Sequence, residues 1–543
     1  MATSAADGAS PTGPANSATG RENSATGRGD TATGRGDTAA VGGDRGVSRD
    51  SGYDIAVLGA GPAGLAAAVA AREAGARVAL IDSAGRVGGQ FWRHRDGDTG
   101  AGHHHWSTLR RLRRAARKLD FLSGHFVWHA ERTDEGFTLH ATVPATVPAN
   151  VPATVPANSH ATVPATVPAS GRDAAGDQTR TIRCRTVIVA TGGYDRQLPF
   201  PGWTLPGVYT AGGAQALLKG HGVAVGRRVV VAGTGPFLLP VAAGLVEAGA
   251  EVLGVFEAGA PGGFARHPAA VLRNLDKLTE GAHYLRVLLR HGVPYRTRST
   301  VIAAHGDGHG DGVRAVTVAS LDADWRVVPG SERQMDCDAV AVGYGFTPQL
   351  DFALQLGCET RLDADGSLVA RADDQQRATV PGVYLAGEIC GVGGAQLSLV
   401  EGELAGLHAA LTTVGAEPSR GAVARLLRRR SALRAFATAM HRVYPVRPGW
   451  AGWLAEDTQV CRCEEVTAGA IRESIAELGA TDPRTVKLLA RPGMGLCQGR
   501  VCGYATTCLV AAAGGREPTE EDFRGIAARP VAQPVTLGML ADG

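Results

Sequence analysis

Two long runs without a charged residue dominate the hydrophobic pattern of the chain. They are residues 55–71, "IAVLGAGPAGLAAAVAA", and residues 229–246, "VVVAGTGPFLLPVAAGLV". Each run is long enough for a membrane span, but a Gly-x-Gly-Pro sequence interrupts it where a spanning helix would prefer continuity. A buried strand, a tight turn and a packed helix explain both runs better. We therefore expect no integral membrane segment.

The same pattern continues on both sides of each run. Residues 53–82 read as strand, glycine turn, helix and strand, and residues 227–258 repeat that order. Strand–helix–strand units with apolar strands form parallel sheets that helices cover. The sequence therefore predicts an α/β fold class with two Rossmann-like dinucleotide-binding domains.

Two stretches interrupt this regular pattern. Residues 1–50 carry an imperfect seven-residue repeat without apolar content, so we expect a disordered low-complexity tail. "ATVP" and related units then recur every four residues from 141 to 169, and proline at that spacing excludes a helix or a sheet ladder. Strand-like "FTLHA" precedes these units and "TIRCRTVIVATGG" follows them. We therefore predict a proline-rich loop insertion, 141–176, within one domain.

Composition and charge exclude some classes of function. The chain has 543 residues, of which 44% are hydrophobic, and a net charge of +3. Its densest basic stretches, 109–118 and 425–434, have helical spacing, so we interpret them as solvated helix faces and expect no nucleic-acid partner. No apolar leader is visible, so we expect a cytoplasmic location, where nine cysteines are thiols or metal ligands rather than disulfides.

The first strand–helix–strand unit carries a nucleotide-binding pattern. Gly59, Gly61 and Gly64 form G-x-G-x-x-G between the strand and the helix. The first glycine allows the turn, the second lets the backbone approach a pyrophosphate, and the third lets helix and strand pack closely. Asp82 ends the next strand, where its carboxylate can accept hydrogen bonds from ribose hydroxyls. These residues predict dinucleotide binding.

The second unit keeps only some of this pattern. Gly233 and Gly235 are present, and Glu257 occupies the acidic position, but Leu238 stands where the third glycine is expected. A bulky side chain there should push the helix and the strand apart. The pattern predicts the fold, and it leaves open whether NAD(P), another adenine nucleotide or nothing binds here.

A further candidate contact lies near the end of the first domain. Gly387 and Glu388 end a strand and precede a glycine-rich helix start. A carboxylate there could hold a ribityl hydroxyl while the helix N-terminal amides face phosphate. The remaining candidate cofactor contacts are Gly89, Gln90, Thr191 and Gly192.

Four cysteines gather near the C-terminus. Cys461 and Cys463 form Cys-x-Cys, and Cys497 and Cys502 form Cys-x4-Cys among several glycines. Four soft thiolates suit an iron–sulfur cluster or zinc, although structural zinc sites favour Cys-x2-Cys. "VCGYATTCLVAAA" looks helical, which would place Cys502 near a helix N-terminus, where a thiolate is favoured. We favour a [2Fe–2S] cluster and keep zinc and free thiols as alternatives. The other five cysteines are interpreted as packing residues, and no catalytic triad or paired carboxylate is evident, so catalytic residues stay unknown.

The ordered motifs "GAGPAG", "ATGG", "GTGP", "GYGFTP" and "AGE" resemble those of the glutathione-reductase-like flavoproteins with two dinucleotide-binding domains. The resemblance covers 51–412 and implies FAD in the first domain, which would be split in sequence. The usual final motif carries Asp where this chain has Glu388. The redox-active cysteine pair of the disulfide reductases is missing, so thiol–disulfide chemistry is not expected.

Residues 457–515 resemble a second family. "CRCEEVT" and "GMGLCQGRVC" are similar to the bacterioferritin-associated-ferredoxin-like [2Fe–2S] domain, which implies all four C-terminal cysteines as ligands. The domain order resembles the FAD/iron–sulfur subunits of opine oxidases, hydrogen cyanide synthase and dye-linked proline dehydrogenases. That resemblance implies a separate, FAD-dependent amino-acid-oxidase-like partner subunit, together with an electron acceptor that stays unknown.

These observations combine into one domain layout. We predict the tail at 1–50 and a small C-terminal α-rich [2Fe–2S] domain at 457–543. Between them we predict the first segment of the FAD-binding domain, the NAD(P)-binding-like domain, the second segment of the FAD-binding domain and a helical linker, at 51–202, 203–350, 351–412 and 413–456 respectively.

Three hypotheses for function follow. The first is an oxidoreductase subunit that relays electrons from an amino acid or opine C–N bond, oxidised on a partner chain, to an acceptor. The second is a self-contained NAD(P)H-dependent flavoprotein reductase, against which the missing third glycine argues. The third is a non-enzymatic iron–sulfur binding or sensing module.

Overall fold

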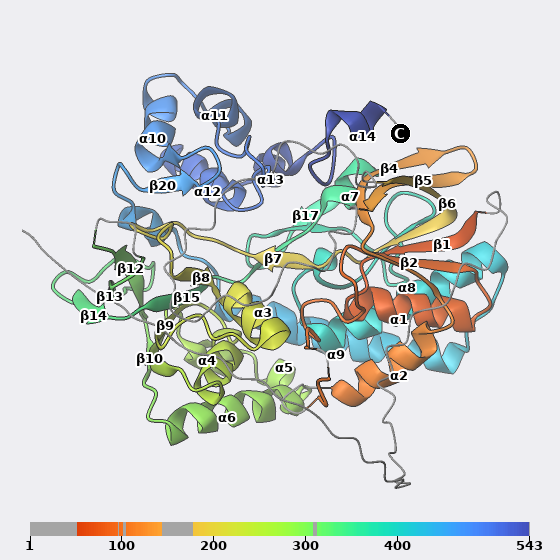
Figure 1. Ribbon diagram of the computed structural model, residues 1–543, viewed down its shortest axis with the longest axis horizontal. Coiled ribbons are helices and arrows are strands. Elements are labelled where there is room, and N and C mark those ends of the chain that lie inside the picture. Colours follow the sequence, from red (N-terminus) through yellow and green to blue (C-terminus); the bar gives the residue numbers. More distant parts are fainter. Residues whose placement is uncertain (1–51, 96, 101–104, 144–177, 308–311, 542–543) are drawn as a thin grey trace, which may run out of the picture. The chain divides into compact units, whose positions relative to one another are not determined.

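The computed structural model describes residues 52–95, 97–100, 105–143, 178–307 and 312–541 (Figure 1). The predicted tail and nearly all of the predicted proline-rich insertion lie outside the described residues. Strand β5 (Gly136–Val143) includes the first three residues assigned to the insertion, because the apolar alternation of the strand continues through Val143. Within the described residues, no helix combines the length and the apolarity needed to cross a membrane.

The first sheet mixes parallel and antiparallel strands. Its order is β3-β2-β1-β6-β5-β4, and β19 pairs with β6 as well. β5 and β6 are antiparallel partners, which confirms that the segments on the two sides of the insertion are neighbouring strands. The remaining strands are β1 (Tyr53–Leu58), β2 (Val78–Asp82), β3 (Asp120–Ser123), β4 (Phe126–Thr133), β6 (Gln178–Val189) and β19 (Val383–Leu385).

Residues after the second domain return to this first sheet. β19 pairs in parallel with β6, and helix α8 (Ala395–Val414) packs against α1 (Pro62–Glu73). The two helices approach closely because α8 has glycine at the contact: a Cβ on Gly402 or Gly406 would lie 2.0 or 2.2 Å from the carbonyl oxygen of Ala63 or Ala67. The first domain is therefore split in sequence, as predicted.

The second sheet is entirely parallel. Its order is β11-β10-β9-β15-β8. The segment of chain that connects β11 to β15 forms a separate three-stranded antiparallel sheet, β12-β13-β14. The strands are β8 (Val208–Thr210), β9 (Arg228–Gly233), β10 (Glu251–Glu257), β11 (Tyr295–Thr297), β12 (Ser299–His305), β13 (Ala315–Ser320), β14 (Arg333–Asp336) and β15 (Ala339–Gly343). The helices are α3 (Ala211–His221), α4 (Leu238–Glu247), η1 (Pro261–Arg266), α5 (Pro268–Leu272) and α6 (Leu275–Arg290).

Two short strands join the domains. β7 (Gly193–Asp195) and β16 (Phe346–Pro348) pair antiparallel, so the "ATGG" and "GYGFTP" motifs lie side by side. Between β16 and β19 the chain forms α7 (Asp351–Gln355) and the hairpin of β17 (Thr360–Leu362) and β18 (Leu368–Ala370). Together with the split first domain, this topology confirms the predicted fold class.

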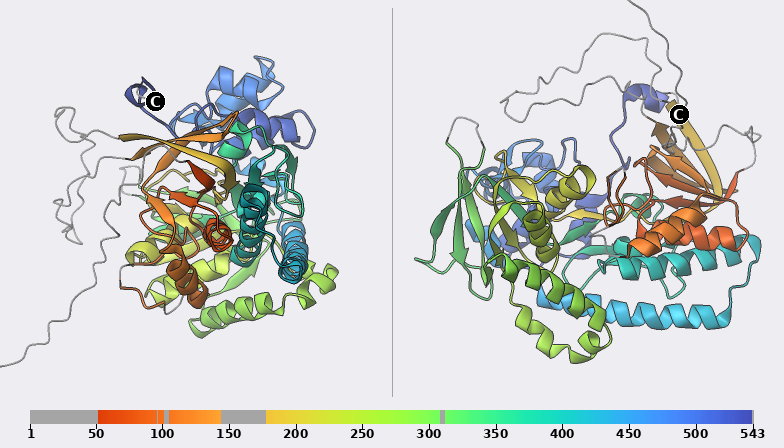
Figure 2. Two further views of the ribbon diagram at one scale, coloured as in Figure 1. Left: turned by 90° about the vertical axis from the view of Figure 1, so that its right-hand side faces the viewer. Right: turned by 60° about the horizontal axis from the view of Figure 1, so that its bottom comes forward.

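The C-terminal region is mostly helical. Figure 2 shows the long helix α9 (Arg420–Val443) beside α8, and it contains the basic stretch 425–434; the other basic stretch lies mostly in α2 (Trp106–Ala116). The small last domain contains η3 (Pro448–Trp453), β20 (Gln459–Cys461), β21 (Val466–Thr467), α10 (Ala468–Ala476), α11 (Pro483–Ala490), α12 (Gly503–Ala513), α13 (Glu520–Ala527) and α14 (Leu537–Ala541). Its hydrophobic core is continuous with that of the second domain.

Candidate functional site

The first glycine turn has the backbone that its sequence predicts. Gly59 has a φ of +99°, and a Cβ there would lie 2.4 Å from the carbonyl oxygen of Ala190. A Cβ on Gly64 would lie 1.7 Å from the carbonyl oxygen of Gly59. Both positions require glycine, the first for the turn and the third for the contact between α1 and the turn.

The middle of the turn has an open backbone surface. Gly61 is the N-cap of α1 and no side chain caps that helix. A Cβ on Gly61 would meet only the Cα of Gly89, at 4.0 Å, and Gly89 itself has a φ of +59°. Bare backbone with uncapped helix amides is what a pyrophosphate requires, so the residues present fit a dinucleotide such as FAD.

Asp82 supports this turn from the end of β2. Its carboxylate accepts hydrogen bonds from the N–H of Ala60 at 2.5 Å and of Ala84 at 2.7 Å. Gln90 is exposed, and its side-chain oxygen accepts a hydrogen bond from Arg93 at 3.0 Å. The roles of Asp82 and Gln90 toward a cofactor stay predictions.

The other first-domain candidates lie where the chain crosses between domains. The Thr191 hydroxyl donates to the carbonyl oxygen of Gln349 at 2.7 Å, and the carbonyl oxygen of Gly192 accepts from the Gln349 N–H at 2.9 Å. After β19, Gly387 has a φ of +82° and begins the short helix η2 (Gly387–Cys390). The Glu388 carboxylate accepts from the N–H of Gly394 at 3.0 Å, and burial raises its pKa. It therefore lies at the start of α8, and a ribityl contact stays a prediction.

The second glycine turn differs from the first. Gly233 has a φ of +132°, and a Cβ there would lie 1.9 Å from the carbonyl oxygen of Gly343. Helix α4 begins at Leu238, three residues after Gly235, whereas α1 begins one residue after Gly61. The leucine at the third glycine position therefore coincides with a later helix start, and the helix amides begin farther from the turn.

Glu257 is fully buried behind this second turn. Its carboxylate accepts hydrogen bonds from the Thr234 hydroxyl at 2.8 Å, the Gly235 N–H at 2.9 Å and the Gly259 N–H at 2.7 Å. Gly235 is the glycine whose backbone would approach a pyrophosphate. The structure thus brings the predicted residues together, and which nucleotide they hold, if any, stays open.

We expect Glu257 to make stability depend on pH. Burial raises the pKa of Glu257 from 4.5 to about 7. The three hydrogen bonds to the carboxylate lower the pKa, but the effect of burial is larger. Because the folded chain holds this proton more tightly than the unfolded chain, stability falls as the pH rises from about 4.5 to about 7 and is constant above that range. Glu257→Gln should reduce this fall by up to about 3 kcal/mol, measured by denaturant unfolding across that range. An identical pH profile in wild type and variant would contradict the assignment.

The four C-terminal cysteines form two pairs of thiols. The inner pair is Cys461, at the end of β20, and Cys502, the N-cap of α12; each is 1% exposed, and their thiols contact each other. The outer pair is Cys463, which is exposed, and Cys497, which is half-buried, and these thiols also contact each other. The predicted helix start at Cys502 is confirmed. Four thiols in this arrangement fit the donor set of a [2Fe–2S] cluster.

The two thiols of the inner pair differ in acidity. The N–H of Gly493 donates to the Cys461 sulfur at 3.5 Å. The Cys502 thiol and then this amide lower the pKa of Cys461 to about 5, while the same thiol–thiol contact raises the pKa of Cys502. A Cβ on Gly495 would lie 2.4 Å from the Cys463 Cβ, so this glycine lets the loop close over the outer pair. The four cysteines outside this domain are all buried, as predicted.

We call residues 491–502, between α11 and α12, the thiol loop. A buried ion pair that the sequence did not indicate holds this loop to the first domain. The Asp351 side chain, at the start of α7, is 1% exposed and binds Arg500 at 3.1 Å and Arg529 at 2.8 Å through one carboxylate oxygen. Arg500 lies between Cys497 and Cys502 and also donates to the Cys497 carbonyl oxygen at 3.2 Å. Arg529 donates to the Gln498 carbonyl oxygen at 2.7 Å. We call Asp351 and its two arginines the Asp351 ion pair.

Two aromatic contacts join the same regions of the chain. The Trp203 indole N–H donates to the carbonyl oxygen of Gln459, two residues before Cys461, at 2.6 Å. Tyr504 follows Cys502 by two residues, and the Arg196 guanidinium lies over its ring, 4.4 Å from the ring centroid. The small last domain is therefore held by Trp203 at β20 and by Arg196 at α12.

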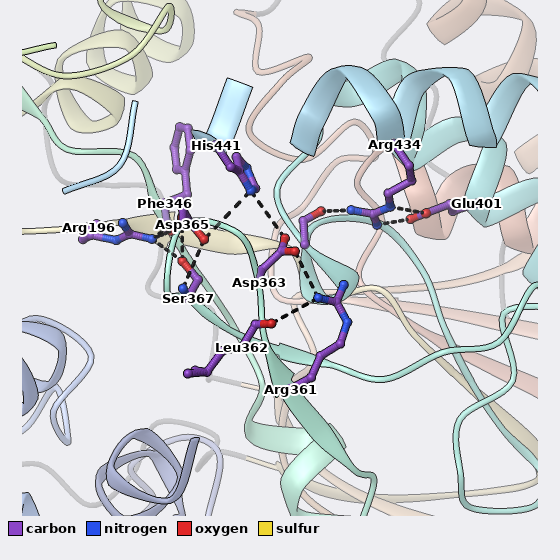
Figure 3. A network of polar contacts seen from close by, with 11 residues as sticks. Arg196, Phe346, Arg361, Leu362, Asp363, Asp365, Ser367, Glu401, Arg434 and His441 are labelled. Carbon is purple, nitrogen blue, oxygen red and sulfur yellow. Dashed lines mark hydrogen bonds and ion pairs between the residues drawn. The ribbon is translucent and has the colours of Figure 1, made fainter. Parts of the chain in front are cut away.

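Arg196 also belongs to the polar network drawn in Figure 3. It binds Asp365 at 2.8 Å, and His441 of α9 lies 3.4 Å from Asp363 and 3.9 Å from Asp365. Although these two carboxylates and the histidine are close enough to hold a metal ion, Arg196 and Arg361 already neutralise the carboxylates. We therefore interpret the cluster as an ion-pair network that fixes α9 to the β17–β18 hairpin. In the same view, Arg434 of α9 binds the buried Glu401 of α8 at 2.9 Å.

Comparison with known families agrees with this geometry. The family described as "Pyridine nucleotide-disulphide oxidoreductase" matches residues 53–412, and "BFD-like [2Fe-2S] binding domain" matches residues 459–512. The first match spans both glycine turns, and the second contains all four paired cysteines.

Curated relatives match most of the chain. Hydrogen cyanide synthase subunit HcnB of Pseudomonas protegens is 32% identical over 85% of this chain and 92% of its own length. An opine oxidase subunit of Agrobacterium tumefaciens is 34% identical over 90% of this chain and 91% of its own length. A crystal structure of L-proline dehydrogenase from P. horikoshii is 21% identical with a TM-score of 0.61, covering 90% of this chain and 79% of that one, and it supports the fold alone.

Proposed function

The chain belongs to the pyridine nucleotide-disulphide oxidoreductase family, and from this premise we propose that it relays electrons within an enzyme that oxidises a C–N bond of an amino acid or opine. It is an FAD-type oxidoreductase with a [2Fe–2S] domain. When bound, FAD supplies two-electron chemistry and the cluster supplies one-electron chemistry. A chain that holds both can convert a two-electron oxidation into single-electron steps.

One observation carries the proposal: the thiol loop is fixed to the flavoprotein fold instead of being held on a linker. Asp351 binds Arg500 of the thiol loop, and Trp203 donates a hydrogen bond to the strand that ends at Cys461. The Gly59–Gly64 turn would hold the FAD pyrophosphate, and the two thiol pairs would hold the cluster. Packing the thiol site on the flavoprotein fold keeps the separation of the two redox sites constant, which suits electron relay, and no residue of the chain needs to act as an acid or base for it.

The substrate and partner are inferred from the relatives. Two of them are named as subunits, of hydrogen cyanide synthase and of opine oxidase, so this chain also belongs to a class of proteins that work in multi-subunit enzymes. We infer that the C–N bond is oxidised on an amino-acid-oxidase-like partner subunit with its own flavin. We also propose that the chain works in the cytoplasm.

Purification of the tagged chain from its native cell tests the proposal. We expect a flavin-containing second subunit to co-purify, and the complex to oxidise an amino acid or opine when a dye is the acceptor. The isolated chain should carry flavin and iron but lack this activity. Full amine dehydrogenase activity in the chain alone would contradict the need for a partner.

Anaerobic mixing of the isolated chain with NADH or NADPH separates this proposal from a self-contained reductase. We expect slow or no bleaching of the flavin absorbance. Helix α4 begins three residues after Gly235, and the Gly235 N–H already donates to the Glu257 carboxylate, so the second turn offers few free amides to a nucleotide phosphate. Rapid bleaching by the chain alone would favour the reductase. A chain purified without flavin would favour the binding or sensing module.

A further inference from the structure

Exposed apolar side chains lie close in sequence to Cys497 of the outer pair of thiols. Leu488 and Leu489 lie at the end of α11 and are 66% and 45% exposed, and Met494 and Leu496 follow in the thiol loop at 36% and 77%. These four residues, which we call the apolar rim, lie within nine positions of the chain. Isolated exposed leucines are ordinary, but four exposed apolar residues in so short a stretch of chain indicate an interaction site.

The apolar rim lies next to the sulfur atoms that face solvent. Leu496 directly precedes Cys497, and the backbone of Gly495 adjoins the Cβ of Cys463. The inner pair, by contrast, is buried in the core that this domain shares with the second domain. A protein that covered the rim would therefore lie against the exposed side of the thiol site.

A groove with cationic walls continues the rim. It has a volume of about 470 Å³, and Leu488 is one of its lining residues together with Arg484, Lys487 and Arg524, opposed by Glu521. Among the described residues, Arg484 and Lys487 form no ion pair, whereas Arg524 lies 3.9 Å from Glu520. The groove thus presents positive charge that the chain itself does not neutralise.

We propose that the apolar rim and this groove form the docking surface for a small acidic protein that carries one electron at a time. An apolar centre gives affinity, and opposite charge at the edge steers the encounter. A second copy of this chain would fit poorly, because a two-fold contact would place these cations opposite one another.

The inference rests on the proposed function. Each C–N bond gives up two electrons, so two carrier molecules would dock in turn and each would leave reduced by one electron.

Calorimetric titration of the holo chain with an oxidised, acidic plant-type [2Fe–2S] ferredoxin tests the surface. We expect a dissociation constant in the micromolar range that weakens about tenfold between about 50 and about 200 mM salt. Lys487→Glu and Leu488→Glu should each weaken binding about tenfold or more. The matched control is Leu289→Glu on α6, since Leu289 is 78% exposed and lies outside the rim and groove; this variant should bind like wild type.

Several results would overturn the inference. Tighter binding of a basic cytochrome c than of the ferredoxin would contradict the charge argument, and an equal effect of Leu289→Glu would contradict the location. Loss of ferredoxin binding in the complex with the co-purified subunit would assign the surface to that subunit instead. Spectroscopy separates the two proposals: a wild-type chain with intact flavin and cluster signals but no ferredoxin binding refutes only the docking surface. A chain without a cluster signal refutes the proposed function and this inference with it.

Discussion

Cys502→Ser is expected to remove the iron–sulfur centre from the purified chain. Cys502 is 1% exposed, its thiol contacts that of Cys461, and it begins α12, so no neighbouring thiol can take its place without moving the helix. Iron should fall at least tenfold from about two atoms per chain, together with the visible absorbance beyond that of flavin. The paramagnetic signal after dithionite reduction should disappear.

Cys508→Ser is the matched control for this prediction. Cys508 lies six residues further along the same helix, outside both thiol pairs, and contacts Tyr504. This variant should keep its iron and its paramagnetic signal. Equal loss of iron from both variants would mean that the helix, and not a ligand, had been disturbed. An unaltered spectrum in Cys502→Ser would contradict the ligand set.

Asp351→Asn is expected to cost about 3–5 kcal/mol of stability, because it leaves two buried guanidinium groups without a counter-charge. The side chains of Arg529 and Arg500 are largely buried, and both direct their bonds to one oxygen of Asp351. The same change should loosen the thiol loop, since Arg500 also binds the Cys497 carbonyl oxygen. Denaturant unfolding measures the first effect, and limited proteolysis of residues 457–541 measures the second.

Asp374→Asn provides the control for the buried pair. Asp374 binds Arg430 at 2.9 Å, but its side chain is 87% exposed. Solvent screens such a pair, so its loss should cost less than about 1 kcal/mol and leave the proteolysis pattern unchanged. Equal effects of the two variants would show that the Asp351 ion pair does not fix the thiol loop.

Short-range patterns in the sequence predicted most of the fold. The glycine turns, the strands on each side of the proline-rich units and the helix that begins at Cys502 all follow from residues that lie close together in the chain. Backbone sterics impose such patterns locally: a positive φ at Gly59 or a Cβ-free contact at Gly64 requires glycine in any tertiary setting. The cofactor classes could be predicted for the same reason.

The contacts that join these units could not be read from the sequence. Asp351 is 149 residues from Arg500 and 178 residues from Arg529 in the chain, and an aspartate after Gln-Leu has no feature that marks it as buried. The glycines at 402 and 406 likewise look like weak helix positions until α1 is packed against them. Only the folded chain shows which distant side chains meet.

The sequence by itself determined that this protein has two glycine turns on α/β units and four thiols suited to a cluster, because local backbone geometry and ligand chemistry leave few alternatives. The tertiary structure decided that the thiol loop is fixed to the flavoprotein fold, that Glu257 is buried against its own turn, and that one pair of thiols faces solvent beside an apolar rim. Burial and the pairing of charges distant in sequence depend on how the domains pack, and packing is a property of the whole chain.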